Sequence, residues 1–459
     1  MNYSGATKAA WLSWICFALL VIALTIILTA WSVRHALVGG AMFTTAQSSI
    51  IIATAEFPGK VRDAFVVLKN WVDGEHSGLL SAKKGINKNG WIRHFPEPRD
   101  DGYLLLAGLD PVVKHSIVRL IRIMDGKELF RWDPNWDYID SKISDKKFYE
   151  KGSKFNLFAN HPLLASNGDI IFNTFNSLIR MDICNRVPLW ILDEAMHHSN
   201  EFDEYGNIWT PSISNEGFAD NPWLHDRVRD DAIALVSPSG NLIRRHSFAK
   251  ILRENDLEFL LSLGNARTGF DLVHLNQISV ARNSSIFWQA GDLLISARSL
   301  STVFLYRPST NRVIWFKTGP WMAQHSANFV GDHMISVFDN HTFGGTPTRQ
   351  PFLIPGDNNR VVLFDFVTQL TSEPFKELLR QSRPVTKGQG RARVLPDGGL
   401  FVEETNFGRH LRFSTGRLLW SRVNDYNDVY IGAVSWSRYL TANEAITPLG
   451  ALRDKKCGQ

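Results

Sequence analysis

Four histidines occupy the same position in a sequence unit that recurs along the chain, each a few residues before a turn that contains glycine. The separation is six to eight residues for the turns at Gly168, Gly206 and Gly331, and it is longer before Gly291. An imidazole can act as a general acid, a general base or a nucleophile near neutral pH. The four residues are His161, His198, His274 and His325.

Two arginines and a further histidine accompany them. Arg391 takes the shared position in a later unit, Arg298 ends the strand pattern that follows Gly291, and His94 lies eight residues before Gly102 in a proline-rich stretch. A group of imidazole and guanidinium side chains favours an anion. Such a group suits the transfer of a sulfuryl or phosphoryl group, in which developing negative charge needs fixed hydrogen-bond donors.

Three or four histidines could instead bind a transition metal. The sequence argues against a metal, because His198, His274 and His325 have neighbours with amide side chains and no acidic residue takes the same position. Neither a Cys-x-x-Cys motif nor a zinc-like Cys/His spacing occurs. We therefore expect a site without a metal and without a cofactor.

Short β-strands must position these side chains. Beyond about residue 90 the chain alternates apolar runs with Gly-Asp, Gly-Asn and Asp-Gly turns, which is typical of β-hairpins. A turn followed by a strand recurs six times, and a second hairpin pattern follows each one. The six turn-and-strand pieces are residues 101–108, 167–175, 205–212, 291–298, 331–338 and 397–405.

Four-stranded units repeated radially make a β-propeller. We therefore predict an all-β fold, a six-bladed β-propeller over residues 90–448, because two separate β-sandwiches would not explain six recurrences. The strand-like tail at 429–440 is expected to close the ring by pairing with the first blade. Since the first strand of every blade lines the central channel, the shared position places the histidines around one mouth of that channel.

The N-terminal region predicts a membrane anchor. Residues 9–33 carry no charge and are long enough to cross about 30 Å of hydrocarbon as a helix. A cleaved signal peptide, the main alternative along with a buried helix, would have a shorter apolar stretch of about 7–15 residues. Tryptophans near both ends of the run favour a single transmembrane helix, which precedes the propeller.

The flanking charges, Lys8 and Arg34, weakly favour an amino end inside the cell. This orientation predicts a single-pass protein of the inner (cytoplasmic) membrane, with the propeller facing the periplasm or the cell exterior. Residues 34–89 are predicted to form a juxtamembrane helical segment packed on the main domain.

Composition sets outer limits on the function. The chain has 459 residues, of which 44% are hydrophobic and 21% charged, which excludes a largely disordered protein. Lys and Arg outnumber Asp and Glu by 50 to 45 without a basic run, so we expect no nucleic-acid partner. A disulfide scaffold is excluded, because only Cys184 and Cys457 lie outside the apolar run and nothing in the sequence argues for a bridge between them.

At the histidine positions the sequence resembles the bacterial arylsulfotransferase (aryl sulfate–phenol sulfotransferase) family, over about residues 90–440. The resemblance implies a six-bladed propeller with an active site at the channel mouth. It implies transfer of sulfate from an aryl sulfate to a phenol through a sulfohistidine, without a nucleotide sulfate donor. The segments that carry it are HHSNEFDEYGNIW (197–209), HLNQISV with GDLLISAR (274–298) and QHSANFVGDHMISVFDN (324–340).

The resemblance also implies roles for individual residues. His325 matches the nucleophile, His274 and Asn276 match a His-x-Asn pair that binds sulfate, and Arg298 matches an arginine that holds the sulfate oxygens.

His198, with His197 as its alternative, matches the remaining active-site histidine, which would protonate the leaving phenolate or deprotonate the acceptor. Trp321 could stack on the aryl group or simply pack in the core. The chain departs from the family in its N-terminal region, which has a predicted anchor where studied members have a β domain that pairs subunits. The paired cysteines of the family are not evident, and the oligomeric state stays open.

A membrane-anchored propeller that binds a ligand or a protein partner without catalysis is the main alternative. The presence of both His325 and Arg298 argues against it. A quinoprotein-like enzyme would need eight blades with repeated tryptophan signatures, which do not occur.

Overall fold

The computed structural model describes residues 4–38, 42–44, 46–48, 50–55, 57–58, 79–81, 90–94, 100–144, 158–174, 176–214, 216–217, 228–262, 271–343, 352–353 and 358–457. The chain divides into two compact units, residues 1–76 and residues 77–459. Each unit is described by itself.

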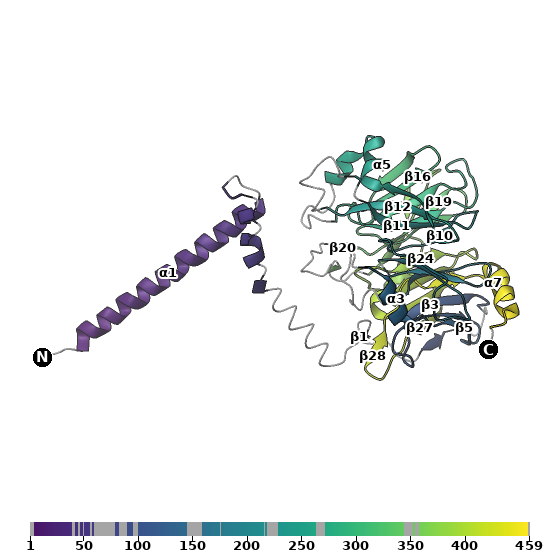
Figure 1. Cartoon of the computed structure of the whole chain (residues 1–459), viewed down its shortest axis with the longest axis horizontal. Helices are drawn as coiled ribbons and strands as arrows, with labels where there is room; N and C mark the ends of the chain where they lie inside the picture. The colour runs from purple at the N-terminus through teal and green to yellow at the C-terminus, as the bar shows by residue number, and fades with distance from the viewer. Residues whose placement is uncertain are drawn as a thin grey trace. The chain divides into compact units, whose positions relative to one another are not determined.

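The first unit contains one long helix, α1 (Ser4–Val38) (Figure 1). Its part Ser13–Ala36 is long and apolar enough to cross a membrane, and its large apolar side chains are exposed. The prediction of one N-terminal apolar helix is therefore confirmed. A signal sequence near an N-terminus would have the same length and composition. Of the predicted juxtamembrane segment 34–89, residues 59–78 and 82–89 lie outside the described residues.

The second unit is a six-bladed propeller of antiparallel sheets, as predicted (Figure 1). Blades 2 to 5 follow chain order, with the strand named first innermost. Blade 2 consists of β6 (Asn160–Leu164), β7 (Ile170–Asn173), β8 (Leu178–Met181) and β9 (Trp190–Leu192). Blade 3 consists of β10 (Glu201–Phe202), β11 (Ile208–Ser214), β12 (Asp230–Val236) and β13 (Leu242–Ser247). Blade 4 consists of β14 (Leu275–Val280), β15 (Leu293–Ala297), β16 (Thr302–Arg307) and β17 (Arg312–Thr318), and blade 5 of β18 (Ala327–Val330), β19 (Met334–Asp339), β22 (Arg360–Asp365) and β23 (Thr371–Ser372).

Strands from both ends of the propeller sequence close the ring. Blade 1 takes its innermost strand from the C-terminal part of the chain, where Tyr439 lies opposite Leu104, so the predicted pairing of the tail is confirmed. Its strands are β29 (Arg438–Leu440), β3 (Tyr103–Leu109), β4 (Ser116–Arg122) and β5 (Glu128–Trp132). Blade 6 comprises β24 (Arg391–Val394), β25 (Leu400–Glu404), β26 (Arg409–Phe413), β27 (Leu418–Val423) and, at its outer edge, β2 (Trp91–Arg93).

The position of β2 corrects one prediction. His94 follows β2 and donates its backbone N–H to the Leu419 carbonyl (2.9 Å), on the outer side of blade 6. It therefore does not lie at the channel position of blade 1. The spacing between His94 and Gly102 resembled that of the other histidines by coincidence. The strand before His94 belongs to the last blade of the propeller and not to the first.

Short helices and two small sheets complete this unit. The helices are α3 (Trp136–Lys142), α5 (Phe248–Glu254), η2 (Glu258–Ser262), α6 (Lys376–Ser382), η3 (Thr405–Phe407) and α7 (Ala442–Asp454). The two-stranded sheets are β1 (Leu79–Ser81) with β28 (Tyr430–Gly432), and β20 (Thr342–Phe343) with β21 (Phe352–Leu353).

The hydrophobic core is divided among clusters that lie between neighbouring blades. Val118 of blade 1 and Phe172 of blade 2 belong to one cluster, while Leu294 of blade 4 and Val337 of blade 5 belong to another. The strands of one blade are therefore packed against those of the next by apolar side chains, which holds the blades together around the channel.

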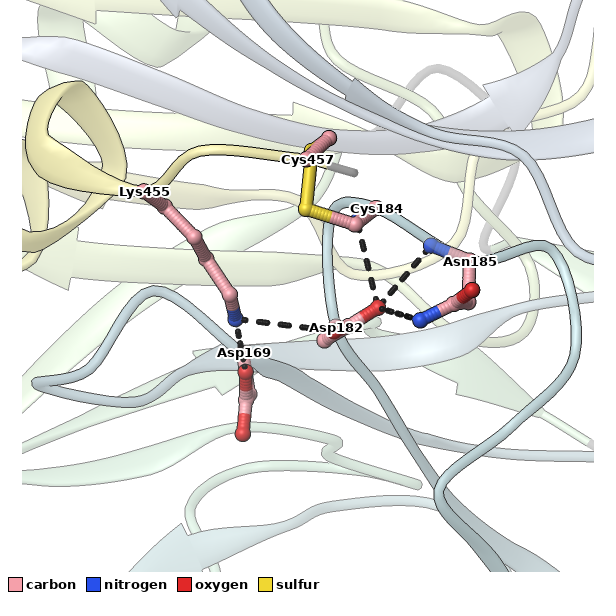
Figure 2. Close-up of a disulfide and its surroundings, with 6 residues drawn as sticks. All are labelled: Asp169, Asp182, Cys184, Asn185, Lys455 and Cys457. Atoms are coloured by element: carbon pink, nitrogen blue, oxygen red, sulfur yellow. Dashed lines mark hydrogen bonds and ion pairs between the residues drawn. A yellow bond between two sulfur atoms is a disulfide. The ribbon is translucent and has the colours of Figure 1, made fainter. Parts of the chain in front are cut away.

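A disulfide joins Cys184 of the β8–β9 connection to Cys457, just after α7 (Figure 2). The sequence offered no argument for this bridge, and the structure corrects that expectation. The two residues meet because α7 returns to blade 2, where Lys455 Nζ lies 3.0 Å from Asp169 Oδ1. Asp182 Oδ1 accepts the backbone N–H of Cys184 (3.1 Å), which orders the turn. The bridge ties the segment after α7, which follows the innermost strand of blade 1, to blade 2.

We predict that removing this disulfide destabilises the propeller. A bridge that closes a loop this long, with a sequence separation of 273, contributes about 2–5 kcal/mol to the free energy of unfolding. The paired replacements Cys184→Ser and Cys457→Ser should therefore lower the melting temperature, as should reduction with dithiothreitol. Cys16→Ser is the control and should have no effect. Equal melting temperatures with and without reductant would contradict the prediction.

Candidate active site

A residue with left-handed backbone stands within four residues of the start of the inner strand of every blade. Non-glycine residues rarely adopt this conformation. It occurs here where the chain turns from the outer strand of one blade into the inner strand of the next, at one end of the channel. The six residues, with φ between 50° and 62°, are His161, His198, His274, Ala323, Gln389 and Trp436.

Three of these residues carry imidazoles that lie in contact. The ring centroids of His161 and His198 are 6.1 Å apart, and those of His198 and His274 are 5.1 Å apart. His197 packs behind His198 with a centroid distance of 4.9 Å. Side chains separated by more than a hundred residues thus meet at the channel mouth, as the shared sequence position predicts.

Trp436 supplies the member of the group from blade 1, which the sequence analysis missed. Its ring lies 3.8 Å from the His161 ring and 6.4 Å from the His325 ring. The buried Glu403 accepts the backbone N–H of Trp436 (2.8 Å) and of Ser437 (2.6 Å). The sequence did contain a signal for Trp436. The strand that closes the ring has a channel position of its own, and the same count of residues that located the histidines in the other blades locates it.

His325 lies two residues beyond the left-handed Ala323 and is 2% exposed. Its Nδ1 is 2.6 Å from Asn340 Oδ1, and its Nε2 accepts the backbone N–H of Gln389 at 2.8 Å. The amide nitrogen of Asn340 donates to the carbonyls of Thr386 and Gln389, so its oxygen faces the ring. These partners assign the proton to Nδ1 and the lone pair to Nε2.

His274 has an acidic partner that the sequence analysis also missed. Its Nδ1 forms a hydrogen bond with Asp271 Oδ2, and Arg229 Nη2 lies 2.7 Å from Asp271 Oδ1. The signal was the spacing Asp-x-x-His in the segment DLVH, which ends at His274. An aspartate on Nδ1 orients the ring and leaves the other nitrogen to accept a proton.

Arg298 follows β15 beside His274, whose carbonyl accepts the Arg298 backbone N–H (3.0 Å). Its side chain is partly exposed. Among the described residues its guanidinium has no hydrogen-bond or ion-pair partner. The donors of Arg298 are therefore available to an anion at the mouth.

Two of the predicted substrate-binding residues are buried in the propeller. Asn276 is fully buried and donates its amide to the Gln324 carbonyl (2.8 Å), which joins blade 4 to the segment that carries His325. Trp321 is 1% exposed and packs with Trp288 and Val337 in the core between blades 4 and 5. The structure thus places Asn276 in a bridge between blades and Trp321 in the packing.

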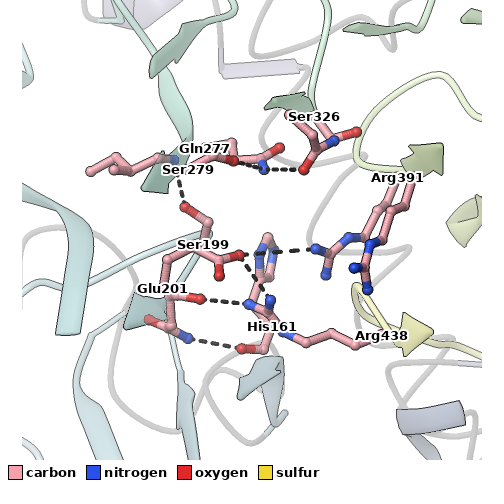
Figure 3. Close-up of polar contacts among 12 residues, drawn as sticks. His161, Ser199, Glu201, Gln277, Ser279, Ser326, Arg391 and Arg438 are labelled. Atoms are coloured by element: carbon pink, nitrogen blue, oxygen red, sulfur yellow. Dashed lines mark hydrogen bonds and ion pairs between the residues drawn. The ribbon is translucent and has the colours of Figure 1, made fainter. Parts of the chain in front are cut away.

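Polar contacts along the inner strands connect neighbouring blades beside the histidines (Figure 3). Ser199 Oγ accepts the Ile278 N–H (2.8 Å), which links blade 3 to blade 4. Glu201 Oε1 pairs with Arg438 (2.8 Å) and lies 3.9 Å from Arg391. Arg391 is therefore a channel-lining residue of blade 6 next to the histidine group.

Burial keeps the imidazoles uncharged. It lowers the pKa of His161, His198 and His325 well below the usual range, and neighbouring positive charges add to the effect. For His325 the largest of these charges is that of Arg298. Burial also lowers the pKa of His274, although Asp271 opposes the shift. Neutral rings carry lone pairs, which nucleophilic and base chemistry require.

Among the described residues, no group of three or more histidine, cysteine or acidic side chains is arranged to hold a metal ion.

Comparison with known proteins gives one family. Residues 190–424, just over half of the chain, match the model of the family described as arylsulfotransferase (ASST). No curated protein matches the chain.

Several solved structures are similar to the chain at low identity. A protein of unknown function from Bacteroides caccae is 12% identical, with 74% of this chain and 99% of that chain covered and a TM-score of 0.41. Virginiamycin B lyase from Staphylococcus aureus is 11% identical, with 62% and 69% covered and a TM-score of 0.33. The WD40 β-propeller domain of Doa1 is 13% identical, with 80% and 98% covered and a TM-score of 0.37.

Proposed function

Because the chain belongs to the arylsulfotransferase family, we propose that it transfers a sulfuryl group from an aryl sulfate to a phenolic acceptor, without a nucleotide sulfate donor. The observation that carries the proposal is the neutral His325, whose lone pair is assigned to Nε2, beside the positive charge of Arg298. A nucleophile and a fixed cation are the two elements that this transfer needs.

The transfer proceeds in two displacements. His325 Nε2 attacks the sulfur of the donor, the bond between sulfur and the aryl oxygen breaks, and the phenolate leaves with the bonding electrons. In the second step the acceptor phenol gives its proton to a neighbouring imidazole and its oxygen attacks the same sulfur. The N–S bond then breaks and returns the electron pair to Nε2, so that His325 is again neutral. The guanidinium of Arg298 stabilises the sulfuryl oxygens in both steps.

The backbone N–H of Gln389 occupies the His325 lone pair at 2.8 Å. The mechanism therefore requires this N–H to leave Nε2 when the donor binds. The same contact is the observation that favours the second candidate function, a propeller that binds a ligand or partner without catalysis, because an occupied lone pair cannot attack.

We further propose that α1 remains as an anchor in the inner (cytoplasmic) membrane, with the propeller facing the periplasm or the cell exterior. Its apolar, exposed surface over Ser13–Ala36 supports this location. A mature N-terminus found at Met1 by protein sequencing would support the anchor. An N-terminus beyond Ala36 would show a cleaved leader instead.

The direct test uses the full chain in detergent with a fluorogenic aryl sulfate and a phenol acceptor. Release of the fluorescent phenol that depends on the acceptor, with the acceptor recovered as its sulfate ester, would support sulfotransfer. Release without acceptor would indicate hydrolysis. No release across several donors, from folded protein, would favour the binding function.

The rate of sulfotransfer should persist into mildly acidic solution. Attack requires the neutral form of His325, and burial and Arg298 lower the pKa of this ring well below 6.5 in the folded protein. The second step also requires a neutral neighbouring imidazole, and burial lowers the pKa of His274 too. The acid limb of the profile of kcat/KM against pH should therefore lie below pH 6.5. An acid limb at pH 6.5 or above would show that the rings titrate as exposed histidines, in conflict with their burial.

A further inference from the structure

His274 has one acidic hydrogen-bond partner, Asp271. Asp271 forms a hydrogen bond with Nδ1 of His274 through one carboxylate oxygen, and its other oxygen lies 2.7 Å from Arg229 Nη2. Because Nδ1 faces a carboxylate, it carries the ring proton, and Nε2 has the lone pair. Among the described residues, His274 Nε2 has no hydrogen-bond partner.

The same arginine reaches the second acidic partner. Arg229 donates from Nε and Nη2 to the two oxygens of Asp231, each at 3.1 Å. Asp231 Oδ1 lies 3.4 Å from His197 Nε2, and His197 Nδ1 lies 2.7 Å from His198 Nδ1. Arg229 thus contacts two carboxylates. Asp271 contacts His274 directly, and Asp231 is connected to His198 through His197.

His274 and His198 differ in solvent exposure. The side chain of His274 is 19% exposed, whereas His198 is 6% exposed and its Nδ1 faces His197. A base must be within reach of the acceptor hydroxyl and must return its proton to water. His274 is the more exposed of the two and meets the second condition. Its charge also acts on His325, the proposed nucleophile, which argues for the first.

Resting on the proposed sulfotransfer, we propose that His274 is the base that takes the acceptor proton and that Asp271 and Arg229 are the positioning pair that orients it. The acceptor O–H bond breaks as its oxygen binds the sulfur, and the proton goes to Nε2 of His274. Asp271 then faces an imidazolium ion, which it stabilises, and the exposed ring loses the proton to solvent.

Several charged or titratable groups face His274: Asp271, Arg229, Arg298, His198 and His325. Asp271 raises the pKa of His274, and Arg229 and Arg298 lower it. Removing the charge of Asp271 therefore lowers this pKa further, while removing the charge of Arg229 raises it. The two substitutions therefore shift the pKa of His274 in opposite directions. General damage to the fold would not produce opposite shifts.

The first experiment measures kcat/KM against pH for the full chain. Asp271→Asn should lower the plateau by about 10- to 100-fold and move the acid limb to lower pH. Arg229→Gln should move the limb to higher pH. The control is Asp332→Asn, which removes the partner of the exposed His333 (2.6 Å) and should leave the profile unchanged. If Asp271→Asn does not fold, Asp271→Glu, which keeps the charge, should retain the wild-type limb.

A second experiment does not depend on sulfotransfer. Diethyl pyrocarbonate modifies neutral imidazoles, and peptide mass spectrometry can follow its reaction at His274 over a range of pH. The midpoint should fall in Asp271→Asn and rise in Arg229→Gln. Midpoints that do not move, or that move in the same direction, would overturn the positioning pair. Midpoints that move as expected in a protein that transfers no sulfate would leave the pair standing and overturn only the sulfotransfer.

Discussion

Replacing His325 with alanine should abolish sulfotransfer, with a loss of about 10³-fold or more in kcat, because the proposed N–S bond forms on Nε2 of this residue. The fold should survive. The side chain has two hydrogen-bond partners, Asn340 and Gln389, and leaving them unpaired costs about 1–3 kcal/mol of the free energy of unfolding. The measurements are the rate of phenol release and the thermal melt of the same preparation.

Trapping identifies the nucleophile directly. Incubation with donor and no acceptor should leave one sulfuryl group on the peptide that contains His325, as seen by mass spectrometry. His333→Ala changes an exposed histidine of the same blade and should keep full activity. A sulfuryl group on the His274 peptide would reassign the nucleophile, and loss of folding in His325→Ala would support a structural role for this residue.

Replacing Arg298 with methionine should lower kcat/KM by about 10²- to 10³-fold, the effect of removing a fixed donor from developing negative charge. Among the described residues its guanidinium has no hydrogen-bond or ion-pair partner, although Asp271 acts on it electrostatically, so the loss should come from the transition state and not from a broken hydrogen bond. Methionine keeps much of the length of the side chain and removes the charge.

Arg312→Met, at the exposed start of β17 in the same blade, is the matched control and should leave kcat/KM unchanged. Arg298→Lys should recover part of the activity, because it restores the charge without the paired donors. Wild-type kcat/KM in Arg298→Met would remove Arg298 from the mechanism.

The sequence predicted those parts of the site that depend on repetition. A strand has a period of two residues and a blade repeats its hairpins, so the separation between a histidine and the next glycine turn locates it along the inner strand. That count predicts that His161, His198 and His274 lie together, and the structure shows their rings in contact. It also predicted that the tail would close the ring.

Other parts depend on contacts without a sequence period. Asp271 and Arg229 meet through segments between strands, where loop conformation decides the partner. The bridge between Cys184 and Cys457 depends on the direction in which α7 leaves the ring, which two cysteines cannot reveal. His94 was misplaced because a strand near the start of the propeller sequence pairs with the last blade.

The closure of blade 1 by β29 sets the order in which a new chain can become active. A ribosome makes α1 before the blade strands and makes β29, the innermost strand of blade 1, after all the other blade strands, together with Trp436. Any translation product that stops before about residue 436 lacks one wall of the histidine cluster, however well its other five blades fold. Under the proposed function, chemical competence is thus acquired in a single late event. Interrupted synthesis yields inert fragments, which proteases can remove without an active intermediate ever forming.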